Sequence, residues 1–132
     1  MEMVVCGNKL ETWTIEYLKE NLVPLHGYSH GSKTFNNFLQ VLSEFTEDQK
    51  REFLMFTIGA PRLPLGGLKH LSPQLTVVKK HPQNEGQPAD DILPSVMTCQ
   101  NYIKLPDYSS KEALRRKLLM AMREGQKSFT LS

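Results

Sequence analysis

The chain has 132 residues, 39% of them hydrophobic and 23% charged, which predicts one soluble globular unit and excludes two full domains. Its 16 Lys and Arg against 14 Asp and Glu give a formal net charge of +2, too weak a field to favour nucleic acid or an anionic membrane as partner. The sequence has no apolar run of about 18 residues and no signal-peptide core, so we expect a cytoplasmic or nuclear protein. Its two cysteines, Cys6 and Cys99, are then most simply free thiols.

The first 26 residues differ in pattern from the rest of the chain. Met3 to Cys6 is a strand-like apolar run, and the spacing of Ile15, Leu18 and Leu22 predicts a short amphipathic helix that Pro24 closes. A strand and one helix cannot bury their own apolar faces. This segment therefore docks either on the remainder of the chain or on an upstream domain.

Two helices are predicted next. Apolar residues spaced by three and four make one stripe over residues 35–45. A second helix begins directly after it, because Thr46 and Gln49 have the spacing of a capping box. Gly59 ends that helix, since glycine takes the left-handed cap readily. The pair predicts a helical hairpin.

Strand patterns follow the helical hairpin. Leu75 to Val78 is a short β-branched strand, and residues 81–91 are so polar that we expect a mobile surface loop. A further strand around Tyr102 stops at Pro106. Cys99 is then expected at a loop-to-strand junction.

The chain closes with a third long helix. A capping box is predicted at Ser109 to Glu112, with a buried face that contains Leu118 and an end at Gly125. Its basic residues are most simply a solvated face. Phe129 stands in a polar tail, where it either folds back on the core or is an exposed anchor for a partner.

Cys99 is the strongest candidate for chemistry. A free cysteine is often only a small buried residue. Turn formers and small polar residues surround Cys99, however, which favours a loop edge, and a thiolate attacks an activated thioester with little help. Cys6 ends an apolar run and is expected to be structural. The four histidines and two cysteines have no metal-ligand spacing, so we expect no metal and no cofactor.

An ordered set of motifs resembles the carboxyl-terminal end of the HECT-type ubiquitin ligases. The match covers nearly the whole chain and is most similar to the ubiquitin-fusion-degradation branch, which includes the thyroid-hormone-receptor-interacting ligase. The matching motifs include FTEDQKREFLMF (45–56), GAPRLPLGGL (59–68), LPSVMTC (93–99), LPDYSS (105–110) and the terminal Phe129.

The resemblance implies an α/β fold in which helices pack on a small, short-stranded sheet. It implies that residues 27–132 are the catalytic C-lobe and that residues 1–26 are the end of the N-lobe and the hinge. Cys99 matches the cysteine that accepts ubiquitin from a conjugating enzyme and passes it to a lysine of a protein substrate. Thr98 matches the threonine that orders the thioester neighbourhood, and Phe129 matches the aromatic residue that orients the lobe. The implied partners are ubiquitin, a conjugating enzyme bound mainly through the N-lobe, and protein substrates.

The chain departs from many family members at Met97, where they carry a histidine. A carboxylate must then help to deprotonate the attacking lysine, supplied by Asp107 or by the N-lobe; Asp107 is as easily a turn residue. We expect the ubiquitin tail to add as a strand near Cys99, at Gln100 and Asn101. The rival hypotheses are a noncatalytic module that binds ubiquitin or another partner and, less favoured, a nucleic-acid binder.

Overall fold

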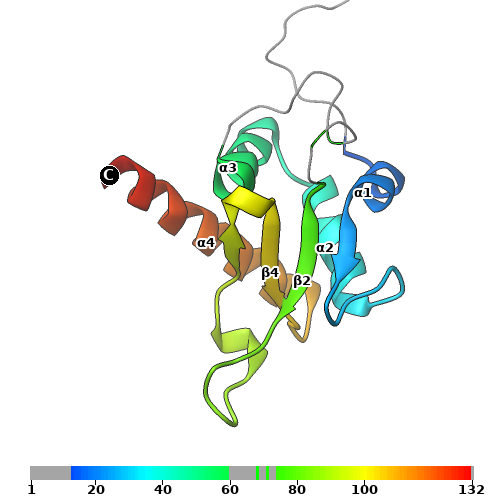
Figure 1. The fold of residues 1–132 in the computed structure, drawn as a ribbon, viewed down its shortest axis with the longest axis vertical. Coiled ribbons are helices and arrows are strands. Elements are labelled where there is room, and N and C mark those ends of the chain that lie inside the picture. The colour runs from blue at the N-terminus through cyan, green and yellow to red at the C-terminus, as the bar shows by residue number, and fades with distance from the viewer. Residues whose placement is uncertain (1–12, 60–67, 69–70, 72–73, 132) are drawn as a thin grey trace, which may run out of the picture.

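A computed structural model describes residues 13–59, 68, 71 and 74–131, with the backbone alone for Cys99 and residues 125–131. The described residues form a mixed α/β fold on a small sheet of short strands, which confirms the predicted class (Figure 1). The elements in chain order are α1 (Ile15–Asn21), β1 (Val23–Leu25), α2 (Lys33–Ser43), α3 (Glu47–Ile58), β2 (Thr76–Lys80), η2 (Ala89–Asp91), β3 (Ser95–Met97), η3 (Thr98–Gln100), β4 (Tyr102–Pro106) and α4 (Lys111–Leu131).

Within the described residues, four strands form one sheet in the order β1-β2-β4-β3. β1 and β4 both run parallel to β2, so that Pro24 and Ile103 flank Val77, whereas β3 runs antiparallel to β4. The sequence pattern does not predict β1, because proline interrupts its three residues. Proline is tolerated there because β1 is an edge strand, where a missing N–H costs no ladder bond.

The hydrophobic core lies between the sheet and the helices α2, α3 and α4. Figure 1 shows α2 and α4 behind the strands. Val77 and Ile103 supply the sheet side of the core and are fully buried, as are Phe35, Phe38 and Phe53 on the helices. The apolar stripe predicted for residues 35–45 is therefore the buried face of α2.

The segment before residue 27 packs into this same core. Trp13, Leu18 and Leu22 are all at most 2% exposed. The Trp13 ring meets Phe53 edge-on, with ring centroids 6.0 Å apart. Of the two alternatives left open by the sequence, the described part of the segment docks on the remainder of the chain. The expected boundary between residues 26 and 27 therefore does not coincide with a break in packing.

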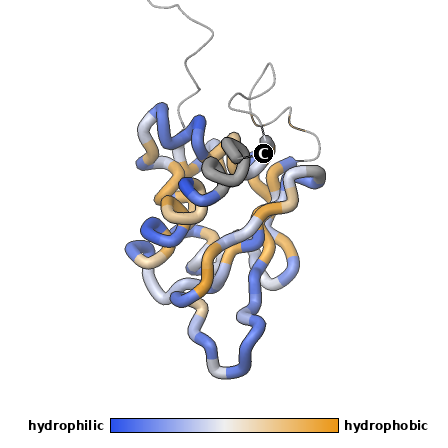
Figure 2. The backbone as a smooth tube through the Cα atoms, turned by 90° about the vertical axis from the view of Figure 1, so that its left-hand side faces the viewer, coloured by the Kyte–Doolittle hydropathy of each residue, from blue (hydrophilic) through white to orange (hydrophobic). Residues whose placement is uncertain are grey.

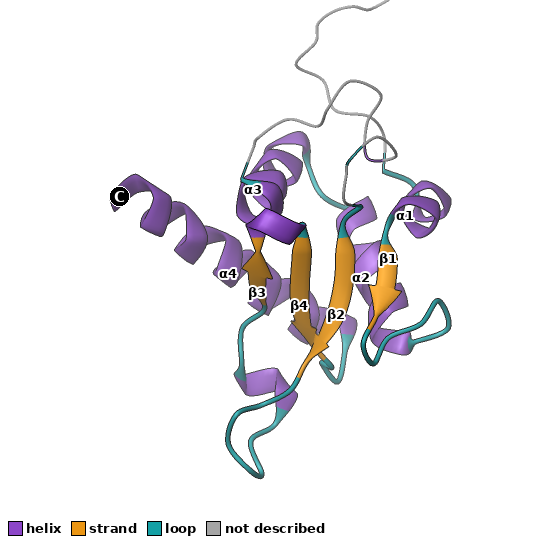
Figure 3. Cartoon of the chain, in the orientation of Figure 1, coloured by secondary structure: helices purple, strands orange, loops and turns teal. Residues whose placement is uncertain are grey.

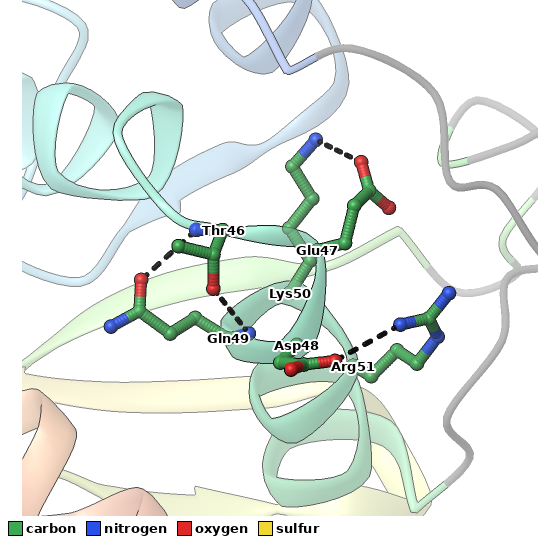
Figure 4. A network of polar contacts seen from close by, with 6 residues as sticks. All are labelled: Thr46, Glu47, Asp48, Gln49, Lys50 and Arg51. Carbon is green, nitrogen blue, oxygen red and sulfur yellow. Dashed lines mark hydrogen bonds and ion pairs between the residues drawn. The ribbon is translucent and has the colours of Figure 1, made fainter.

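The capping box predicted for α3 is confirmed (Figure 4). The Gln49 N–H donates to Thr46 Oγ1 at 3.1 Å, and the Thr46 N–H donates to Gln49 Oε1 at 3.0 Å. The helix ends at Gly59, whose φ of 78° is the left-handed cap expected of glycine.

The two ends of α4 differ from the sequence prediction. Ser110, not Ser109, caps the helix: its Oγ accepts from the Ala113 N–H at 3.1 Å, while Ser109 binds Asp90. The helix also continues through Gly125 to Leu131, because a glycine within a helix costs only about 1 kcal/mol and need not end it. The predicted irregular tail around Phe129 is therefore wrong for the backbone.

Residues 81–91 form a largely exposed excursion from the sheet, as predicted, and Figure 2 shows it as the hydrophilic loop at the bottom. Its far end is anchored. The Ser109 N–H donates to Asp90 Oδ1 at 2.9 Å, and the Ser109 hydroxyl donates to Asp90 Oδ2 at 2.5 Å. The mobility of this loop stays a prediction.

Candidate functional site

Cys99 lies in the tip of a β-hairpin. Met97, the last residue of β3, pairs with Tyr102, the first of β4, so residues 98–101 reverse the chain between them. Three of these four residues form η3, which sits against α3 at one end of the sheet (Figure 3). The expected loop-to-strand junction at Cys99 is confirmed.

Asn101 completes the reversal. Its φ of 55° and ψ of 44° place it in the left-handed region, and its N–H donates to Thr98 O at 3.3 Å. Its carbonyl accepts from the Thr76 N–H of β2 at 2.9 Å. The first of these hydrogen bonds closes the turn, and the second ties the tip of the hairpin to β2, one of the two inner strands of the sheet.

The neighbours of Cys99 in the tip are open to solvent. Thr98 and Gln100 are exposed, and Met97 is half-buried. Asn101, which we expected to contact ubiquitin beside Gln100, is only 8% exposed. The backbone therefore carries Cys99 through an exposed turn, while the Asn101 side chain belongs to the interior.

Asp107 is not brought near Cys99. It follows β4 whereas η3 precedes it, and a five-residue strand is roughly 16 Å long. The Asp107 carboxylate accepts from the Thr34 hydroxyl and pairs with Lys79 Nζ at 3.4 Å. Of the two sources of a base that the sequence left open, Asp107 and the N-lobe, the structure does not favour Asp107, because the length of β4 separates it from Cys99 and its carboxylate is engaged elsewhere.

The end of the sheet at Asp107 holds a polar cavity of about 400 Å³. It opens between the turn before α2 and the turn before α4. Lys33 and Lys79 supply positive charge and Asp107 negative charge to its wall, and the Ser109 carbonyl accepts from Lys33 Nζ at 3.4 Å. Because the charged groups of its wall already pair with groups of the same chain, the cavity is most simply a structural contact between elements.

The titratable groups with shifted pKa lie away from the hairpin tip. Burial raises the pKa of Tyr28 and of Tyr108 well above the usual range. Burial, reinforced by the charge of Lys104, lowers the pKa of Lys80. None of these groups falls within residues 97–101, so the tip offers no tuned acid or base of its own among the described side chains.

The remaining candidates rest on the sequence. Cys6 lies outside the described residues, and Phe129 contributes its helical backbone near the end of α4. In the described part of the chain, no three His, Cys, Asp or Glu residues converge on a possible metal site. No described helix combines the length and apolar character needed to cross a membrane.

The conformation of Asn101 is the feature that sequence reasoning missed. Asparagine tolerates the left-handed region better than other residues with a side chain, and it follows directly on a predicted turn. That signal was present in the sequence. It indicated the backbone conformation of the turn, and a contact of Asn101 with ubiquitin stays a prediction.

Comparison with known proteins places the chain in one family. Residues 1–132 match the model of the HECT domain, described as a ubiquitin-transferase. The whole chain is 52% identical over 132 residues to the E3 ubiquitin-protein ligase TRIP12 of Danio rerio and 47% identical over 141 residues to UPL3 of Arabidopsis thaliana. It is also 44% identical, over 97% of its length, to ubiquitin fusion degradation protein 4 of Saccharomyces cerevisiae. The chain spans only 6%, 7% and 9% of these three proteins, respectively.

Proposed function

The chain belongs to the HECT-domain (ubiquitin-transferase) family, and we propose that it accepts ubiquitin as a thioester on Cys99 and passes it to a substrate lysine. The observation that carries this proposal is the position of Cys99 in an exposed hairpin tip, between the exposed residues Thr98 and Gln100. A cysteine that only filled the core would have no need of such a turn.

The proposed reaction has two steps. The Cys99 thiolate attacks the thioester carbonyl that joins ubiquitin to a conjugating enzyme; a new C–S bond forms, the old one breaks, and the conjugating enzyme leaves as its thiolate. A substrate lysine amine then attacks the new thioester, loses a proton, and releases Cys99. The first step exchanges one thiolate for another and needs no strong base. The second needs a base, because the usual pKa of lysine is about 10.4.

The base for the second step is proposed to come from outside the described residues. Asp107 is held at the far end of β4 by Thr34 and Lys79. Met97 carries no titratable group. The carboxylate of an Asp or Glu in the N-lobe of the full ligase is therefore the proposed base. Thr98, exposed beside Cys99, is proposed to order the thioester neighbourhood, and Phe129 to orient the lobe during transfer.

The ubiquitin tail is proposed to reach Cys99 as an added strand. β3 is an edge strand of the sheet and ends at Met97, two residues before Cys99. An exposed edge offers main-chain donors and acceptors to an extended peptide. Gln100, exposed on the other side of Cys99, is a candidate contact for the end of that tail.

Other parts of the ligase are proposed to supply further binding sites. Because the chain spans less than a tenth of the relatives named above, the conjugating enzyme is proposed to bind mainly through the N-lobe, and protein substrates through other parts of the ligase. A cytoplasmic or nuclear location fits the ubiquitin pathway.

The test is a reaction between the purified chain and ubiquitin that carries a thiol-reactive electrophile at its C-terminus, followed by intact mass. This bypasses the missing docking site for the conjugating enzyme. We expect one adduct in the wild-type chain and in Cys6→Ala, and none in Cys99→Ala. If no adduct forms and a small alkylating agent also spares Cys99, the thiol is buried. The noncatalytic binding module would then be the better description.

A further inference from the structure

Two residues other than glycine have positive φ in the described part of the chain, His26 at 48° and Asn101 at 55°. The left-handed region is costly for L residues because Cβ approaches the following carbonyl oxygen, and asparagine is among the few that visit it. Such conformations persist only where the surroundings impose them. Asn101 lies two residues from Cys99.

The surroundings of Asn101 show what its conformation achieves. The three residues of η3 form one turn of right-handed helix. The left-handed residue Asn101 follows them and reverses the chain direction, so that Tyr102 can pair with Met97. The Asn101 carbonyl then meets the Thr76 N–H at 2.9 Å, which ties the turn to β2. A right-handed residue at this position would direct that carbonyl away from β2.

Asn101 is largely shielded from solvent. It is 8% exposed, whereas its neighbour Gln100 is exposed. Thr76, which anchors the Asn101 carbonyl, is itself 6% exposed. The anchoring of the hairpin tip is therefore an interior arrangement, next to the exposed residues Thr98 and Gln100.

We propose that Asn101 is a positioning residue for Cys99: its left-handed backbone closes the β3–β4 hairpin and fixes the direction in which the Cys99 peptide meets the ubiquitin tail. This inference rests on the proposed function and assigns Asn101 a backbone role in place of ubiquitin contact. The positioning should matter for ubiquitin and not for a small reagent. The ubiquitin tail must reach Cys99 along one path, whereas a small reagent reaches a thiol from any open direction.

The test compares Asn101→Ala, Asn101→Gly and the control His26→Ala in the same chain. Glycine adopts positive φ without a Cβ clash, and alanine does not. His26 is a matched control, because its carbonyl also accepts from a β2 N–H, that of Lys79 at 3.2 Å, at the other end of the sheet. Each variant is reacted with electrophile-ended ubiquitin and with iodoacetamide over a range of pH, below its measured melting temperature.

We expect Asn101→Ala to slow the ubiquitin adduct about tenfold, the size of a 1.4 kcal/mol penalty for the conformation, without slowing alkylation by iodoacetamide. Asn101→Gly should restore the ubiquitin rate to within about twofold of wild type, and His26→Ala should match wild type in both reactions. The proposal is overturned if Asn101→Ala reacts with electrophile-ended ubiquitin as fast as wild type. It is equally overturned if Asn101→Gly is as slow as Asn101→Ala, since the side chain of Asn101 and not its backbone conformation would then matter.

Failure of the proposed function looks different. In that case wild type forms no ubiquitin adduct at Cys99, and Cys99→Ala changes nothing. Hydrogen exchange at the Thr76 amide, which donates to the Asn101 carbonyl, then still tests Asn101: a proposal about turn geometry requires faster exchange in Asn101→Ala and restored protection in Asn101→Gly. Equal exchange in all variants would overturn it.

Discussion

Asp107 shows how proximity in sequence can mislead at the scale of single residues. It is the first acid after Cys99, yet a strand separates them. Its carboxylate accepts from the Thr34 hydroxyl and faces Lys79, so it joins the start of α2 to β2 and to the chain before α4. The structure therefore gives Asp107 a role in holding elements together.

Asp107→Asn should lower the free energy of unfolding by about 1 kcal/mol, because it removes a half-exposed ion pair and weakens a charge-assisted hydrogen bond. Urea denaturation measures this change. The rate at which Cys99 reacts with electrophile-ended ubiquitin should stay within about twofold of wild type in the folded variant, since no chemical step there needs Asp107. A loss of stability without a loss of reactivity separates the structural role from a catalytic one. A large drop in reactivity in the folded variant would restore Asp107 to the site.

At the scale of elements, Asp90 links the long polar loop to the start of α4. Hydrogen bonds from the Ser109 hydroxyl and N–H lower the pKa of Asp90, with a smaller contribution from Arg116 and Lys117. A carboxyl with a lowered folded-state pKa stabilises the fold above its unfolded value and loses that contribution as the pH falls through the folded value. The link should therefore be present at neutral pH and weaken in acid below the usual value of 3.8.

Asp90→Asn should lower the melting temperature at pH 7 by about 2–4 °C, which corresponds to a loss of roughly 1 kcal/mol in a chain of this size. The difference from wild type should shrink as the pH falls below about 4, where the wild-type carboxyl is protonated as well. Thermal melts of both proteins from pH 7 to pH 3 measure this. Asp91→Asn, on the adjacent exposed residue, serves as the control. A difference between Asp90→Asn and wild type that is constant over this range would contradict the assigned cause.

Elements were predictable from the sequence where local chemistry decides them. The α3 capping box needs only Thr46 and Gln49, both within one turn, and it forms as predicted. The start of α4 was not decided locally: Ser109 could cap a helix, but Asp90, 19 residues earlier, takes its hydroxyl. β1 was missed for the same reason, because a three-residue strand that contains Pro24 exists only through pairing with β2.

The features of the candidate site also divide into those decided by neighbouring residues and those decided by distant ones. That Cys99 lies in a turn follows from the residues around it. The separation of Asp107 from Cys99 depends on the length of β4, and the anchoring of the Asn101 carbonyl depends on the N–H of Thr76, which is 25 positions away in the chain. Non-local partners of this kind carry no signal in one sequence.

At the scale of the whole molecule, the hairpin that carries Cys99 and the polar cavity occupy opposite ends of one sheet. β2 connects them: its Thr76 N–H anchors Asn101 near Cys99, and its Lys79 faces Asp107 at the cavity. β1, which pairs with β2, comes from the segment before residue 27. The integrity of the sheet at the site therefore depends on residues that the family resemblance implied to be the end of the N-lobe and the hinge.

This dependence gives a direct test on α1. Leu18 is fully buried in the core, whereas Ile15, on the same helix, is 38% exposed. Leu18→Ala should lower the free energy of unfolding by about 2–5 kcal/mol, because it leaves a cavity beneath α1, and Ile15→Ala should change it by less than about 0.5 kcal/mol. Both values come from urea denaturation of the 132-residue chain. If α1 instead belonged to a separate lobe, the two variants would unfold alike and a fragment of residues 27–132 would be as stable as the full chain. We expect that fragment to lose most of its stability, since it lacks β1 as well as the buried side chains of Trp13, Leu18 and Leu22.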